Sequence, residues 1–106
     1  MPSKQPKFIK VLHMQAEGEM KPLQIKKDLN MFRALVGGHV AFTPLRMSKE
    51  EWKGWKHTAE RLGVPHIKTP FVAVNEDGLG MCLPTNKFVP HLVGNIVLVD
   101  KKDRLR

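Results

Sequence analysis

The sequence predicts an α+β domain in which two helices accompany a mostly antiparallel sheet, in the order β-β-α-β-α-β-β-β. Three features support this prediction. An apolar run at residues 71–74 is followed by the turn residues Asn75-Glu76-Asp77-Gly78 and by a second apolar run at 79–83, which is the pattern of a β-hairpin. Residues 96–99 form a continuous apolar run, which is typical of a buried strand. Residues 48–62 carry apolar side chains at helical spacing.

The first half of the chain is expected to supply three strands. Residues 8–14 are rich in apolar and β-branched side chains. Residues 21–27 alternate apolar and polar positions, so they are expected to pair antiparallel with the first strand. Residues 39–45 are expected to be the third strand, with Pro44 near its end.

A short helix is expected between the second and third strands, because apolar residues recur at helical spacing over residues 29–36. Asp28 or Asn30 can cap its start, since short polar side chains accept hydrogen bonds from free helical N–H groups. Gly37-Gly38 is expected to end it.

The longer helix is the most informative candidate for function. Ser48 followed by Glu51 is a capping box, and Gly63 is expected to end the helix. One stripe of the helix is apolar and another is basic; the apolar stripe holds Trp52, Trp55, Ala59 and Leu62, and the basic one holds Lys49, Lys53 and Lys56. Either both indoles belong to the core and the lysines are a solvated face, or the helix docks on a partner or a phosphate backbone.

The length and composition indicate one domain. We assign residues 1–7 to a flexible N-terminus, residues 8–100 to the domain and residues 101–106 to a charged tail that frays. No apolar run is long enough for a membrane span, and the single cysteine, Cys82, excludes an internal disulfide. A cytoplasmic protein without a membrane partner is therefore expected.

The formal net charge of +8 in 106 residues raises the prior for an anionic partner such as nucleic acid, an acidic membrane surface or an acidic protein. The alternative is that the charge only keeps a small protein soluble. Lys greatly outnumbers Arg, so contact with nucleic acid would involve the backbone and discriminate little between bases.

No catalytic or cofactor motif is recognisable. The five histidines lack the spacing of a helical metal-binding pair, and Cys82 lies between apolar neighbours, as expected for a core thiol. Asn86 is expected to satisfy backbone groups of its own loop. We therefore expect no catalytic residues, no metal, no cofactor and no enzymatic activity.

Four motifs in order resemble a family of small domains of unknown function encoded by bacteriophages, plasmids and their bacterial hosts. The motifs are Leu35-Val36-Gly37-Gly38, Asn75-Glu76-Asp77-Gly78, Leu83-Pro84-x-Asn86 and the segment VGNIVLV at residues 93–99. The resemblance covers roughly residues 8–100 and implies an accessory protein of phage or mobile-element origin, with no established activity. Typical members are near neutral or acidic, and many have a shorter segment before the NEDG motif, so the resemblance implies that the basic helix at 48–62 is a specialisation of this chain.

These observations favour a non-enzymatic accessory protein that binds a host macromolecule in the host cytoplasm, in the manner of host-takeover or anti-defence proteins. Its expected contact residues lie on the longer helix: Lys49, Trp52, Lys53, Trp55, Lys56 and Arg61. The first alternative is a nucleic-acid-binding protein that uses the same lysines together with Lys101, Lys102, Arg104 and Arg106. The second is a small enzyme whose scattered His and acidic residues converge. The expected partner is a host protein or nucleic acid, and the oligomeric state, including a homodimer, stays open.

Overall fold

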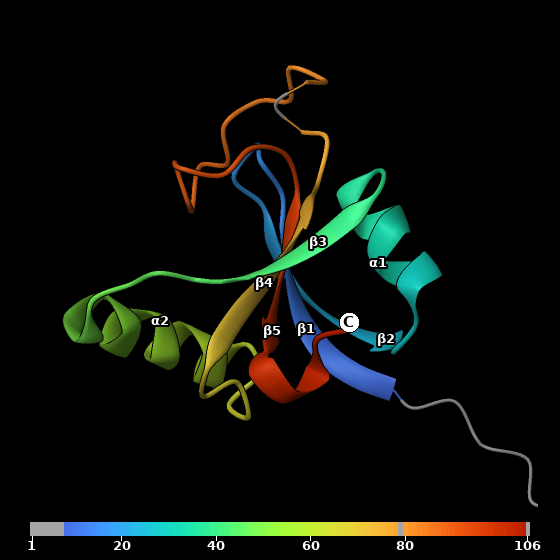
Figure 1. Cartoon of the computed structure of the whole chain (residues 1–106). Coiled ribbons are helices and arrows are strands. Elements are labelled where there is room, and N and C mark those ends of the chain that lie inside the picture. Colours follow the sequence, from blue (N-terminus) through green and yellow to red (C-terminus); the bar gives the residue numbers. More distant parts are fainter. Residues whose placement is uncertain (1–7, 79, 106) are drawn as a thin grey trace, which may run out of the picture.

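The computed structural model describes residues 8–78 and 80–105 and contains a five-stranded antiparallel sheet with two helices (Figure 1). The strand order across the sheet is β2-β1-β5-β4-β3. The elements in chain order are β1 (Phe8–Met14), β2 (Met20–Lys26), α1 (Leu29–Val36), β3 (Val40–Pro44), α2 (Lys49–Arg61), β4 (Pro70–Asn75), β5 (Ile96–Asp100) and the 3₁₀ helix η1 (Lys101–Asp103). The predicted α+β class is confirmed.

The two helices cover opposite faces of the sheet (Figure 1). Side chains of a strand point alternately to its two faces, so each central strand contributes to both cores. In β5, for example, Val97 and Val99 face α1, whereas Ile96 and Leu98 belong to the core beneath α2. All four are almost completely buried, which explains why this strand reads as a continuous apolar run.

Both helices begin at the residues that the sequence indicates. The Asp28 side chain accepts a hydrogen bond from the Met31 N–H at 2.9 Å, so Asp28 is the cap of α1. Gly37 ends this helix in a left-handed conformation with φ of 80°. Ser48 and Glu51 form the predicted capping box of α2.

The predicted hairpin at residues 71–83 is wrong in its second strand. Leu79 lies outside the described residues, and residues 80–83 are turn and loop. β4 already pairs with β3 on one edge and with β5 on the other, so no free edge remains for a hairpin partner. Successive short-range hydrogen bonds wind the segment into turns instead, with the Gly78 N–H donating to Asn75 O and the Met81 N–H to Asp77 O.

The C-terminal segment is also more ordered than predicted. Residues 101–103 form η1, and Asp103 is buried with 4% of its surface exposed. The Arg104 guanidinium lies 4.7 Å from the centre of the Phe71 ring, and Leu105 packs on the core beneath α1. The segment therefore covers the end of the sheet. The predicted flexible N-terminus at residues 1–7, and Arg106, lie outside the described residues.

Candidate functional site

The two tryptophans of α2 anchor the helix to the sheet. Trp52 and Trp55 are half-buried and pack against the core that contains Leu12 and Leu98. The Trp55 ring meets Phe88 edge to face, with the ring centroids 6.2 Å apart. Much of the indole surface thus packs inside the protein and part of it stays exposed. The two tryptophans are therefore neither fully buried core residues nor a fully exposed docking surface.

The charges of α2 are mixed. Lys49, Lys53, Lys56 and Arg61 are all exposed, as a contact surface requires. The same helix carries three carboxylates, at Glu50, Glu51 and Glu60, so its formal net charge is only +1 with His neutral. Because neighbouring carboxylates repel phosphates, α2 is a weak attractor for a polyanion.

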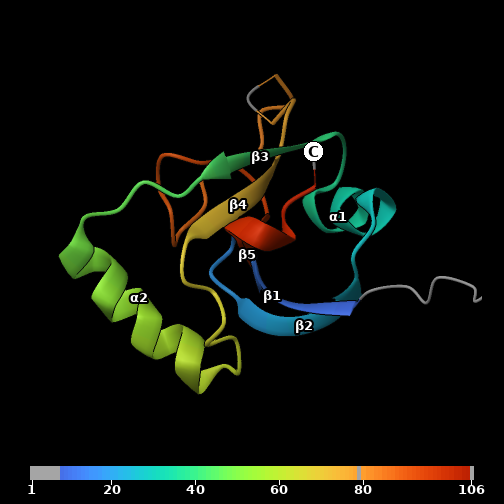
Figure 2. The same ribbon diagram turned by 60° about the horizontal axis from the view of Figure 1, so that its bottom comes forward.

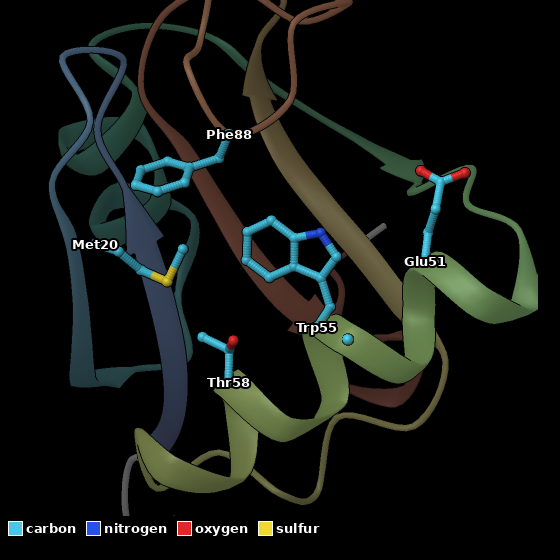
Figure 3. Close-up of a pocket in the computed structure, with 6 residues that line it drawn as sticks. Met20, Glu51, Trp55, Thr58 and Phe88 are labelled. Carbon is cyan, nitrogen blue, oxygen red and sulfur yellow. The ribbon is translucent and has the colours of Figure 1, made fainter.

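An open depression of about 490 Å³ lies between α2 and the loop that precedes β5 (Figure 3). Trp55, Phe88 and Met20 converge on it, and Thr58 and Glu51 lie along the helix side. Gly54 completes the wall, and a Cβ atom at this position would meet nothing within 4 Å. The depression is mainly apolar and has no cluster of titratable groups.

A second surface gathers cations at the end of the sheet where β1 begins and β5 ends. Figure 2 turns this end towards the viewer and shows η1 where β5 ends, with β1 and β2 below it. We call it the basic end and define it by the charged or titratable residues Lys10, Lys27, His66, Lys68, Lys101, Lys102 and Arg104. They come from four separate stretches of the chain.

Side-chain and backbone contacts tie these stretches together. His66 Nε2 lies 3.0 Å from the carbonyl oxygen of Lys10, and Lys27 Nζ donates to the carbonyl oxygen of Lys102 at 3.2 Å. Shallow cavities run over the same surface, and Lys102 lines three of them. The largest measures about 590 Å³ and is also lined by His66, Lys68 and Asp100.

The buried Asp100 side chain accepts hydrogen bonds from two of the segments that form the basic end. Its Oδ1 accepts the N–H groups of Lys68 and Thr69 at 2.7 and 3.0 Å, and its Oδ2 accepts that of Lys102 at 3.1 Å. Burial alone would raise the pKa of the Asp100 carboxyl, but the three N–H groups and the Lys102 ammonium outweigh burial and lower the pKa below its ordinary value. The Asp100 carboxylate therefore holds together the two segments that carry Lys68 and Lys102.

At the basic end the cations outnumber the carboxylates. Of the three carboxylates beside these cations, Asp100 is 7% exposed, Asp103 is 4% exposed and Asp28, next to Lys27, is half-buried. The side chains of Lys10, Lys68, Lys101 and Lys102 are exposed. This concentration of positive charge distinguishes the basic end from α2.

The contact residues predicted from the sequence thus lie on two separate surfaces, the basic end and α2. The structure brings Lys101, Lys102 and Arg104 together with Lys10, Lys27 and Lys68, which sequence reasoning missed. The six predicted residues on α2 belong to a different surface. Lys10 and Lys68 are far apart in the sequence, and the β1–β5 pairing, the contact of His66 with the Lys10 carbonyl oxygen and the hydrogen bonds of Asp100 bring them together.

The motif residues have structural roles. The buried Asn86 donates through Nδ2 to the carbonyl oxygens of Met14 and Gly94, at 3.0 and 2.9 Å. Its Oδ1 accepts the N–H groups of Phe88 and Val89, at 2.9 and 3.2 Å. This confirms the predicted role of Asn86 in its loop.

The two motif glycines that pack against this loop have little room for a side chain. A Cβ atom at Gly78 would lie 2.8 Å from a methyl group of Val93. One at Gly94, where φ is +76°, would lie 2.9 Å from Leu83. The NEDG and VGN motifs therefore specify the packing of the loops at the end of the sheet opposite the basic end.

Outside the basic end, three titratable side chains, those of Arg33, His39 and Glu76, line one cavity of about 200 Å³. Among residues 8–78 and 80–105, no group of three or more His, Cys, Asp or Glu side chains has a metal-binding arrangement. Cys82 is exposed, with a left-handed φ of 55°, so the prediction of a core thiol is wrong. Its place in the turn, outside the sheet, is the physical reason.

Within the described part of the chain, neither helix has the length and apolar character that crossing a bilayer requires. Comparisons of the sequence with protein-family models and with curated proteins, and of the structure with solved structures, find no match. The site must therefore be interpreted from its own geometry and charge.

Proposed function

We propose that this protein is a non-enzymatic nucleic-acid-binding protein that contacts the phosphate backbone through the basic end. One observation carries the proposal: cations from four stretches of the chain meet on one surface, where they outnumber the neighbouring carboxylates and two of these carboxylates, Asp100 and Asp103, are buried. A polyanion gains most from such a surface, because each neutralised phosphate releases condensed counterions.

The residue types indicate how such a protein would bind. Five of the cations at the basic end are lysines, which act on phosphates as point charges. The sixth, Arg104, lies over Phe71, so its guanidinium plane is partly engaged within the protein. We therefore expect binding with little preference for base sequence.

A second candidate function is the binding of a host protein through α2, and the open apolar depression beside Trp55 and Phe88 favours it. Lys49, Lys53, Lys56 and Arg61 would then flank the contact. An origin in a phage or another mobile element, and action in the host cytoplasm, are compatible with either function and remain proposals based on the motif resemblance.

A salt titration tests the proposed function. Fluorescence anisotropy would follow the binding of a labelled random 20-mer oligonucleotide to the protein between 50 and 200 mM salt. Roughly four to six phosphate contacts predict a slope of about −3 to −5 in a plot of log affinity against log salt. An affinity that stays flat over this range, or undetectable binding at 50 mM salt, would contradict the proposal.

A further inference from the structure

The basic end carries an exposed aromatic ring. Phe8, at the start of β1, is 56% exposed. The chain has five Phe and two Trp, and all seven lie in the described residues; the other six are buried or half-buried. An exposed phenyl ring loses the free energy that burial would give it, so its position beside a cationic surface calls for an explanation.

The strand places Phe8 on the same face as the cations. Residues two apart in a strand share a face, so Phe8 and Lys10 both lie on the α2 side of the sheet. The two residues line one open cavity of about 270 Å³ together with Ile9, His66, Lys102 and Asp103. On its β2 side Phe8 is paired with Lys26, whose side chain is also exposed.

An exposed phenyl ring and several ammonium groups on one open surface suit a single-stranded nucleic acid better than a duplex. In a duplex the bases are stacked on each other and paired, so a phenyl ring on the protein surface reaches a base face only by wedging between base pairs and unstacking them. In a single strand a base is free to stack on the ring while its phosphates meet the lysines. Every base has an aromatic face, so such stacking does not depend on sequence.

We propose that the nucleic acid bound at the basic end is single-stranded and that Phe8 is the platform on which one base stacks. The inference rests on the proposed function, since the lysines supply the contacts to the backbone. Phe8 contributes the selection for unpaired bases, and the lysines contribute the salt dependence. The two contributions can therefore be measured separately.

The stacking contribution of Phe8 and the phosphate contacts of the lysines can be measured separately by comparing the affinities for three ligands. These are a 20-nucleotide oligo(dT), an abasic strand with the same number of phosphates, and a 20-base-pair duplex. The wild-type protein should bind oligo(dT) more tightly than either of the others. Phe8→Ala should bind oligo(dT) about 5- to 150-fold more weakly, the range for loss of one base–aromatic stack, with no change in affinity for the abasic strand. Phe8→Trp should retain the preference for oligo(dT).

Met81→Ala is the matched control, because Met81 is 54% exposed and lies in the turn after β4. It should bind all three ligands as the wild type does. Unchanged binding of oligo(dT) by Phe8→Ala, or an equal loss for oligo(dT) and the abasic strand, would overturn the stacking role and leave the proposed function standing. Salt-insensitive or undetectable binding of all three ligands would overturn both.

Discussion

At the scale of single residues, polar side chains hold the irregular segments of this protein in place. Asn86 and Asn75 accept backbone N–H groups of the loops that follow β4, and Asp100 does the same for the loop before it. A buried acceptor of this kind fixes a segment that has no ladder of its own. At the basic end, Asp100 fixes the segments that carry Lys68 and Lys102.

Asp100→Asn should destabilise the protein by about 1–3 kcal/mol at pH 7, because an amide cannot accept all three hydrogen bonds that the carboxylate accepts. The folded state lowers the pKa of Asp100 below the ordinary value of 3.8, so the stabilisation is present above that pH and is lost as the pH falls through the folded-state pKa. Urea unfolding at pH 7 and pH 3 measures both effects.

The variant should therefore lose less stability than the wild type between pH 7 and pH 3. Asp77→Asn is the control, because the Asp77 side chain is exposed in a turn, and it should match the wild type. Equal unfolding free energies for Asp100→Asn and the wild type at both pH values would show that Asp100 does not organise the loop.

At the scale of elements, the start of α2 is stabilised by capping, whereas a glycine in its middle lowers its helical stability. Its start has a full capping box, and its two indoles attach it to the core. Gly54 lies in its middle, where glycine costs helix stability through the conformational entropy it loses on folding. No contact in the structure requires glycine there, because a Cβ atom would have no neighbour within 4 Å.

Gly54→Ala should therefore raise the unfolding free energy by about 0.5–1 kcal/mol. Gly63→Ala is the contrasting variant: Gly63 has φ of +82°, which alanine adopts only with strain, so that variant should be less stable than the wild type. Thermal unfolding of the three proteins measures the difference. A less stable Gly54→Ala protein would mean that α2 needs a glycine at this position.

The same scale shows how far the sequence could predict the fold. Elements with local signals were predicted within one or two residues: α1 from Asp28 and Gly37, α2 from Ser48 and Glu51, and β5 from its apolar run. The second hairpin strand was wrong because the partners of β4 are β3 and β5, and β5 lies about twenty residues further along the chain. The apolar run at residues 79–83 and the turn before it contain no information that both edges of β4 are already paired, with β3 and with β5.

At the scale of the whole molecule, the fold separates two surfaces of different character. α2 presents mixed charges beside an apolar depression, and the basic end presents positive charge beside Phe8. Only Lys101, Lys102 and Arg104 of the basic end could be predicted, because they adjoin in the sequence. Lys10, Lys27 and Lys68 join them through tertiary structure, for which the sequence contains no local signal.

The most direct measurement compares two charge-matched double variants in binding a labelled 20-mer oligonucleotide at 50 mM salt. Lys68→Glu/Lys101→Glu changes the basic end and Lys53→Glu/Lys56→Glu changes α2; each lowers the formal net charge from +8 to +4. All four lysines are exposed, so thermal unfolding should show both variants folded. We predict that the first variant binds at least about tenfold more weakly than the second, through lost phosphate contacts. Equal affinities, or a larger loss for the α2 variant, would contradict the assignment of the basic end as the binding surface.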